Sequence, residues 1–280
     1  MISRINILGV MLLVFMCSIL RAENFTAPIG FAYWDVGRFY DTIPSLFYDD
    51  RDYTPEGKNS WGALRYGRKV ERVAAVLDSM HFPIVALCGV ESESVVRDIV
   101  KATMCDYSYL HRTIDGRDGL DFALLYYGDV LFIDYVQTFY GRIYIEGEIA
   151  QSRVGIWLTW SGYYMKSASP PHRNGEVEAT IVAGRMYRKD VVDMRLEDIM
   201  RPHERAARGN AHSSSGWYMR DRIGIGGSIE LSQCGVYITP WLLDDNRVPK
   251  PTFSKRGYVG GCSSYLPICI YFRMPQQTPQ

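Results

Sequence analysis

The run Phe31-Ala32-Tyr33-Trp34-Asp35-Val36 is aromatic and β-branched, and it predicts a buried strand near the start of the chain. From Trp61 to Met80, apolar residues recur at helical spacing with arginine and lysine between them, which predicts an amphipathic helix. Pro83 ends that helix, and the five apolar residues Ile84 to Cys88 predict a second strand buried on both faces. These three elements indicate a protein that mixes helices and strands around one core.

Farther along the chain, strands outnumber helices. A second helix is expected over Glu93 to Ala102 and a third over Val191 to Met200, whereas the polar segment Arg201 to Gly216 predicts a long mobile loop. Strands are expected at residues 120–127, 130–135, 142–148, 154–160, 178–183, 235–239 and 267–272, and Gly128-Asp129 predicts a hairpin between the first two. No βαβ unit repeats. The predicted fold class is therefore α/β, with two packed β-sheets flanked by helices in a four-layer sandwich.

The first 22 residues predict a signal peptide. Arg4 precedes an uncharged apolar run from Ile7 to Leu20 that is too short for a stable membrane anchor, and Ala22 stands at a plausible cleavage position. We therefore expect a single domain over residues 23–280 that is exported to the periplasm, the cell envelope or the medium and has no transmembrane anchor after cleavage. Lipidation of Cys17 is disfavoured by the preceding Met16 but stays open.

Charge and cysteine spacing argue against two classes of function. Residues 1–22 contain two of the 31 basic residues and none of the 31 acidic ones, so the remaining chain is slightly acidic. A protein that binds nucleic acid through its phosphates usually carries a basic excess, so a nucleic-acid partner is not expected. The other cysteines are odd in number and lack CxxC spacing, which argues against a zinc site.

Several segments carry a resemblance to a known family when they are taken in chain order. They are Trp34–Asp41, Pro55–Trp61, Leu87–Glu91, Asp118–Tyr126, Thr159–Tyr163, Gly184–Arg188 and Cys262–Ile268. Their positions resemble the motifs Y-N-V-E-N-L-F-D, P-E-G-x-x-x-W, L-x-E-V-E, R-G-I-D-V-A-L-L-Y, H-F-P-S-R, G-D-F-N-D and Y-S-D-H-L-P-V of the endonuclease/exonuclease/phosphatase family, most closely its exported bacterial members. The resemblance covers residues 30 to 272.

The resemblance implies a phosphoesterase framework from which much of the chemistry is missing. The family's main magnesium ligand, a glutamate, is Gly89 here, and the Asp and Asn of G-D-F-N-D are Arg185 and Tyr187. The final histidine is Tyr265, and the aspartate beside it is Ser264. Mg²⁺ prefers carboxylate oxygens, and arginine cannot act as a base, so these exchanges disfavour metal-dependent hydrolysis.

Some acidic residues remain at or near family positions. The resemblance thus implies a remnant cleft formed by Asp35, Glu91, Asp121, Asp221 and Tyr265, in which no residue is assigned a catalytic role. Glu91 lies two residues after Gly89 and is a poor substitute for the missing ligand. Asp221, flanked by Arg220 and Arg222, is expected to form a structural ion pair.

The sequence leaves three functional hypotheses. The first is an exported non-catalytic binding or scaffold protein without metal or cofactor, whose rebuilt cleft binds a protein or an anion through Arg185, Tyr187, Arg188 and Trp160. In that case Trp157, Trp160, Tyr163 and Tyr164 are expected to line or plug the cleft. The second is a Mg²⁺- or Mn²⁺-dependent phosphodiesterase, nuclease or phosphatase with a shifted site. The third is a structural subunit of an envelope assembly.

Overall fold

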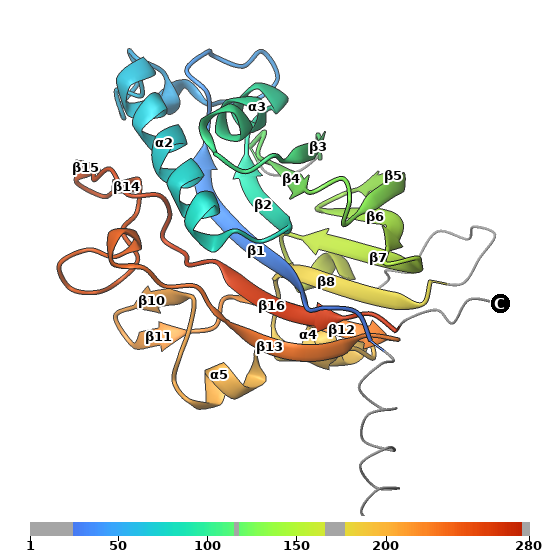
Figure 1. The fold of residues 1–280 in the computed structure, drawn as a ribbon. Coiled ribbons are helices and arrows are strands. Elements are labelled where there is room, and N and C mark those ends of the chain that lie inside the picture. The colour runs from blue at the N-terminus through green and yellow to red at the C-terminus, as the bar shows by residue number, and fades with distance from the viewer. Residues whose placement is uncertain (1–24, 115–117, 166–176, 276–280) are drawn as a thin grey trace, which may run out of the picture.

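The computed structural model describes residues 25–114, 118–165 and 177–275, and two six-stranded sheets form its body (Figure 1). The strands of the first sheet, in spatial order, are β13 (Glu230–Val236), β16 (Ile268–Arg273), β1 (Ile29–Phe39), β2 (Ile84–Val90), β4 (Asp121–Tyr126) and β3 (Ser108–Arg112). Those of the second are β5 (Phe132–Phe139), β6 (Arg142–Ile149), β7 (Ser152–Thr159), β8 (Ala179–Arg185), β12 (Asp221–Gly227) and β9 (Glu197–Asp198).

Helices and short pairs of strands complete the fold. The helices are α2 (Ala63–Met80), α3 (Glu93–Ala102), α4 (Arg188–Asp193) and α5 (Arg201–Arg205), and the 3-10 turns are η1 (Arg51–Tyr53), η2 (Gly162–Met165) and η3 (Pro240–Leu242). The short pairs are β10 (Ala211–Ser213) with β11 (Gly216–Tyr218), and β14 (Phe253–Ser254) with β15 (Gly257–Tyr258). No helix among these described elements combines the length and the apolar character needed to cross a bilayer.

The main core lies between the two sheets, and β1 shows how the sequence builds it. Side chains alternate between the two faces of a strand. Phe31 and Tyr33 of β1 pack into the core between the sheets, while Trp34 and Val36 pack against α2 and α3 on the outer face. Burial of each such side chain contributes on the order of 2 kcal/mol.

The outer face of the second sheet carries a smaller apolar cluster. Tyr144 and Trp157 of this sheet pack there with Val191 of α4. The layers are therefore α2 with α3, the first sheet, the second sheet, and α4. The predicted sandwich of two packed sheets flanked by helices is confirmed.

Several sequence-based expectations for individual elements are wrong. Gly128-Asp129 does not close a hairpin, because β4 pairs with β2 and β3 in one sheet whereas β5 pairs with β6 in the other. The helix expected at 191–200 is instead the short α4 followed by β9, and the segment 201–216 contains α5 and β10. Strands β3 and β12 were not expected. The predicted signal peptide and the loop at 166–175 lie outside the described residues.

Candidate functional site

The predicted cleft positions come together because of strand direction. Strands β1 and β2 are parallel, as are β7 and β8, so the carboxyl ends lie together within each sheet. Arg220 contacts Asp35 of the first sheet and Asp221 of the second, which places both sets of carboxyl ends at one end of the sandwich. Strands β4 and β12 run antiparallel to their neighbours and begin at that same end, with Asp121 and Asp221 as their first residues. Arg185 pairs in register with Asp221.

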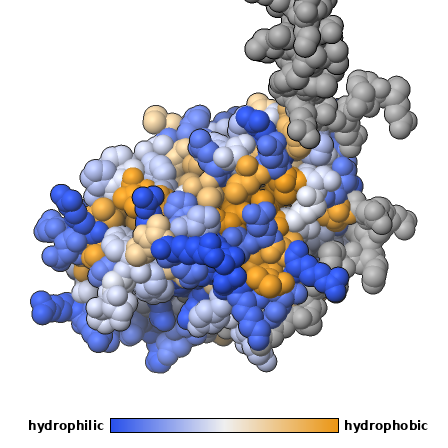
Figure 2. Space-filling model, turned by 90° about the horizontal axis from the view of Figure 1, so that it is seen from below, coloured by the Kyte–Doolittle hydropathy of each residue, from blue (hydrophilic) through white to orange (hydrophobic). Residues whose placement is uncertain are grey.

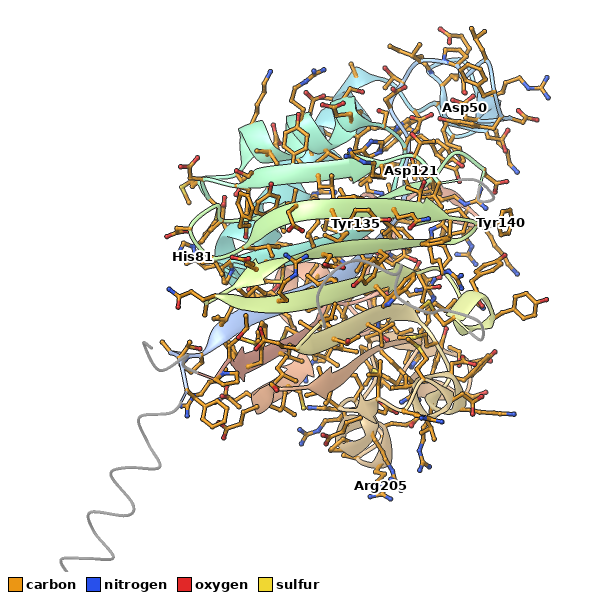
Figure 3. The ribbon with its side chains drawn as sticks, turned by 90° about the vertical axis from the view of Figure 1, so that its right-hand side faces the viewer. Asp50, His81, Asp121, Tyr135, Tyr140 and Arg205 are labelled. Carbon is orange, nitrogen blue, oxygen red and sulfur yellow. The ribbon has the colours of Figure 1, made fainter. Side chains whose placement is uncertain are left out.

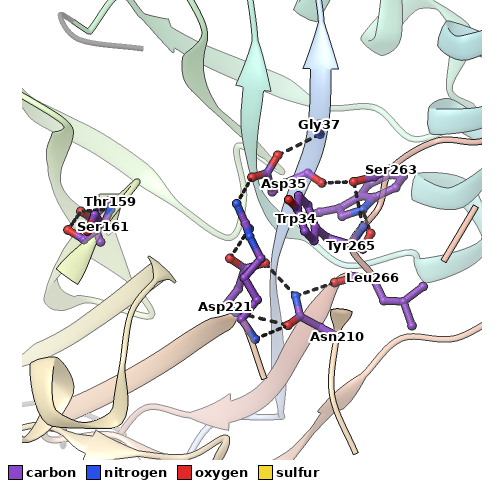
Figure 4. Close-up of polar contacts among 11 residues, drawn as sticks. Trp34, Asp35, Gly37, Thr159, Ser161, Asn210, Asp221, Ser263, Tyr265 and Leu266 are labelled. Atoms are coloured by element: carbon purple, nitrogen blue, oxygen red, sulfur yellow. Dashed lines mark hydrogen bonds and ion pairs between the residues drawn. The ribbon is translucent and has the colours of Figure 1, made fainter. Parts of the chain in front are cut away.

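A buried arginine joins the two sheets at this end (Figure 4). The guanidinium of Arg220 donates from one nitrogen to Asp35 Oδ2 at 2.8 Å and from another to Asp221 Oδ1 at 2.6 Å. The side chain of Arg220 is only 9% exposed, and both aspartates are buried. Because Asp35 belongs to β1 and Asp221 to β12, one cation bridges a carboxylate of each sheet.

The remaining oxygens of both carboxylates also accept hydrogen bonds from the protein. Asp35 Oδ1 accepts from the backbone N–H of Gly37 at 2.8 Å. Asp221 Oδ2 accepts from the side-chain amide of Asn210 at 2.7 Å. Burial lowers the pKa of Arg220, but the charges of Asp221 and Asp35 outweigh burial and leave that pKa above its ordinary value. The predicted ion pair of Asp221 is confirmed, and Arg220 is its partner.

Tyr265, which stands where the family resemblance places a histidine, lies over the guanidinium of Arg220. Its ring centroid lies 3.7 Å from Cζ of Arg220, a cation–π contact. The backbone around Tyr265 is fixed, because its carbonyl accepts from Trp34 Nε1 at 2.9 Å and its N–H donates to Ser263 Oγ at 3.1 Å. Tyr265 therefore forms part of a closed polar cluster with Asp35, Arg220 and Asp221.

Asn210 anchors this cluster from the segment in which we expected a mobile loop. Its Oδ1 accepts from the backbone N–H groups of Arg220 at 2.9 Å and Asp221 at 3.2 Å. Its Nδ2 donates to Asp221 and to the carbonyl of Leu266 at 3.2 Å. The side chain is completely buried, and its hydrogen-bonding groups are used. Asn210 was missed from sequence, since a lone Asn in a polar stretch carries no periodic signal.

Gly89 stands beside Asp35, where the resemblance places the metal-binding glutamate. Its φ of +89° lies in the left-handed region that favours glycine. A Cβ at this position would lie 2.0 Å from the carbonyl oxygen of Gly37 and 3.1 Å from Asp35 Oδ1. The backbone itself therefore fills the place from which a carboxylate would reach the cleft.

Glu91 and Asp121 point into other networks. Glu91 accepts hydrogen bonds from the backbone N–H of Asp41 and, at 2.8 Å, from the hydroxyl of Tyr48. Asp121 accepts from the backbone N–H of Ile114 at 2.8 Å and lies 3.2 Å from His111 Nε2. Burial raises the pKa of both carboxyls, that of Glu91 to about 7. Glu91 thus holds the loop before α2 and does not replace the missing ligand.

A polar pocket of about 340 Å³ opens over the arginine cluster. Arg185, Tyr187, Arg220 and Tyr265 line it together with Ser161 and Tyr218. Arg185 is exposed, and no ion pair in the described part of the chain involves it. Two of the four predicted binding residues, Arg185 and Tyr187, therefore share this pocket.

The other two predicted binding residues lie elsewhere. Trp160 is only 7% exposed and packs with Phe122 in the core between the sheets, because its position just after β7 points inward. Trp157 is buried on the opposite face of the second sheet, so the expected aromatic plug does not form. Arg188 is exposed on α4 and does not line this pocket.

The donor set at the strand ends does not fit a divalent metal. Mg²⁺ needs several oxygen ligands, yet each carboxylate oxygen of Asp35 and Asp221 already accepts a hydrogen bond, two of them from a cation. Within residues 25–114, 118–165 and 177–275, no group of three or more His, Cys, Asp and Glu could hold a metal ion.

Comparisons with known proteins agree with this architecture. Residues 30–148 match the model of the Endonuclease/Exonuclease/phosphatase family. The fold resembles an endonuclease/exonuclease/phosphatase from Bacteroides vulgatus (9% identity, TM-score 0.54, 89% of this chain and 100% of that chain). It also resembles a family protein from Bacteroides thetaiotaomicron (11% identity, TM-score 0.53, 90% and 99%).

A third solved structure is also similar, whereas no curated protein matches the chain by sequence. TDP2 from C. elegans has a similar fold (11% identity, TM-score 0.54, 90% of this chain and 76% of that chain). The match over residues 30–148 and the shared fold confirm the resemblance to the endonuclease/exonuclease/phosphatase family that the motifs predict.

Proposed function

We propose that this protein does not hydrolyse phosphoesters and works as a binding protein that takes an anionic group in the pocket above Arg220. The observation that carries the proposal is the bridge from Arg220 to Asp35 and Asp221. In the family that this chain resembles, a metal cation stabilises charge on the phosphoryl oxygens during hydrolysis. Here a fixed side-chain cation neutralises the carboxylates that such a metal would need.

The pocket retains features that favour an anion. Arg185 presents a guanidinium to the opening, and the tyrosines around it can donate hydroxyl hydrogens. Arginine forks match the geometry of phosphate and carboxylate groups. Arg220 adds positive charge at the floor, although Asp35 and Asp221 balance most of it. The signal peptide expected at residues 1–22 supports action outside the cytoplasm.

A hydrolysis assay tests the first part of this proposal. Purified protein is incubated with bis-p-nitrophenyl phosphate and either Mg²⁺ or Mn²⁺, and release of p-nitrophenol is followed by absorbance. We expect no metal-dependent release. Turnover that EDTA abolishes, and that is lost in Asp35→Ala and Asp221→Ala, would instead support an enzyme with a shifted site.

A titration tests the second part. Inorganic phosphate is titrated into the unmodified protein, Arg185→Gln and Arg188→Gln, and the heat of binding is measured. Both arginines are exposed, but only Arg185 lines the pocket. We expect about tenfold weaker binding for Arg185→Gln and unchanged binding for Arg188→Gln. Equal effects of the two substitutions would place the anion elsewhere.

A further inference from the structure

A loop next to the first strand presents large apolar side chains to solvent. We call residues 41–50 the tip loop. Ile43 is 71% exposed, Leu46 is 94% exposed and Phe47 is 93% exposed. Contiguous exposed apolar groups of this kind mark interaction sites on soluble proteins.

The tip loop is held firmly by its own polar groups. Glu91 binds the N–H of Asp41 and the hydroxyl of Tyr48, so one buried carboxyl joins the two sides of the loop. Asp50 accepts the N–H of Ser45 through both oxygens, at 3.1 and 3.0 Å, and Ser45 Oγ accepts the N–H of Phe47 at 3.1 Å. Because these hydrogen bonds already order the tip loop, binding of Leu46 and Phe47 by a partner costs little conformational entropy.

An apolar pocket of about 490 Å³ lies at the other end of the molecule. We call it the end pocket. Its walls include Trp217, Val236, Ile238 and Leu243, and the turn after α5 contributes the rest of one side. Pockets of roughly 300–1,000 Å³ hold drug-sized groups, so the end pocket has room for the two side chains of the tip.

The tip loop and the end pocket also carry opposite charge. Four aspartates and one arginine lie between residues 41 and 52; Asp50 is buried and Asp49 pairs with Arg51, so the negative charge at the surface comes from Asp41 and the exposed Asp52. Arg208 and Arg247 stand at the end pocket, none of its lining residues is acidic, and in the described part of the chain no ion pair involves either arginine. Opposite charges at two surfaces guide them together and fix their orientation.

One molecule cannot make this contact with itself. Figure 3 shows Asp50 of the tip loop and Arg205, next to the end pocket, at opposite ends of the molecule. Figure 2 looks onto the side of α5 and β13 and shows apolar surface there between charged side chains. A contact between different patches on two copies is heterologous, so it adds one copy after another unless the ring closes.

We propose that copies of this chain assemble head to tail, with Leu46 and Phe47 of one copy inserted into the end pocket of the next. An anionic membrane surface is a less suitable occupant for the tip, because the aspartates beside Phe47 would be repelled by it. The head-to-tail contact does not involve the pocket above Arg220. Each copy of the chain carries both complementary surfaces, the tip loop and the end pocket.

Two variants separate the two surfaces. Leu46→Ser with Phe47→Ser removes the tip, and both side chains are almost fully exposed, so folding is not affected. Gly235→Leu fills the end pocket, because Gly235 lines it and a Cβ added there has no atom within 4 Å. Met104→Ser is the matched control, since Met104 is 89% exposed and lies outside both surfaces.

The test is the mass in solution, measured by sedimentation velocity over a wide range of concentration, with circular dichroism to verify that each variant is folded. We expect the unmodified protein and Met104→Ser to form species larger than one chain, and each of the two surface variants to sediment as single chains. An equimolar mixture of those variants has one intact tip and one intact pocket per pair. It should therefore form pairs and nothing larger.

Reversing the charge of the two arginines at the end pocket tests the electrostatic part of the same contact. Arg208→Glu combined with Arg247→Glu should raise the dissociation constant about tenfold or more, and high salt should weaken the unmodified assembly. The proposal fails if the unmodified protein is a single chain at every concentration, if the surface variants assemble as before, or if their mixture stays monomeric. A monomer that binds neutral lipid vesicles through Phe47 would also overturn it, in favour of a membrane.

Discussion

Two groups of buried carboxylates that the family resemblance places in one cleft have acquired different surroundings. Asp35 and Asp221 share the guanidinium of Arg220. Glu91 is also buried, but its partners are a backbone N–H and a tyrosine hydroxyl, and its pKa is raised to about 7 by burial. A carboxylate removed from water needs either a cation or a proton. Here Asp35 and Asp221 have an internal cation, whereas burial moves Glu91 toward the protonated form.

Removing the internal cation is the strongest test of this comparison. In Arg220→Met, Asp35 and Asp221 would remain buried without a counter-charge, which commonly costs about 3–5 kcal/mol of unfolding free energy. We expect a loss of that size, measured by urea denaturation at neutral pH.

The controls separate charge from volume. Arg185→Met removes an exposed arginine without an ion pair in the described chain, and it should change stability by less than about 0.5 kcal/mol. Adding Asp35→Asn and Asp221→Asn to Arg220→Met should restore most of the lost stability, because no unpaired charge is then buried. If Arg220→Met behaved like Arg185→Met, the guanidinium bridge would not be an important part of the structure.

A second prediction concerns the backbone that closes the cleft at Gly89. Gly89→Ala should cost about 2 kcal/mol or more, because φ is +89° and the new Cβ would meet the carbonyl of Gly37. Gly235→Ala is the matched control at an open position of β13, and it should be nearly neutral. Denaturation midpoints of both variants check this. Similar midpoints would show that the backbone at Gly89 can relax, and Gly89→Glu would then be worth testing for restored metal binding.

The sequence predicted the layers better than the site. The continuous apolar run Ile84 to Cys88 predicted a buried strand and forms β2, and α2 and α3 follow their apolar periodicity closely. The segment between residues 191 and 227 was predicted poorly, because short elements such as α4 and β9 depend on tertiary packing and not on local pattern.

The site illustrates a second limit. That Gly89 replaces the family's metal-binding glutamate and Tyr265 its histidine was visible from the motifs. That Arg220 supplies the missing charge was not, because an arginine next to an aspartate in sequence is most often exposed to solvent. Only the position of Asp35, on a distant strand, turns Arg220 into a bridge between the sheets. The prediction of Trp160 as a binding residue was wrong, because the direction of its side chain depends on the fold and it faces the core.

The smallest expected effect comes from the group that has no cation. The pKa of Glu91 is raised from its ordinary value near 4.5 to about 7 in the folded state, so between these values the folded protein binds more protons than the unfolded chain. The stability contributed by this group is therefore fully present below about pH 4.5 and is lost as the pH rises through about 7. In Glu91→Gln the side chain cannot ionise, while its amide can still accept from Asp41 and donate to Tyr48. Compared with the unmodified protein, Glu91→Gln should thus gain relative stability between pH 4.5 and pH 8 by about 2 kcal/mol, as read from urea denaturation across that range. Parallel stability curves for the two proteins would mean that Glu91 remains ionised when buried, and the contrast with Asp35 and Asp221 would disappear.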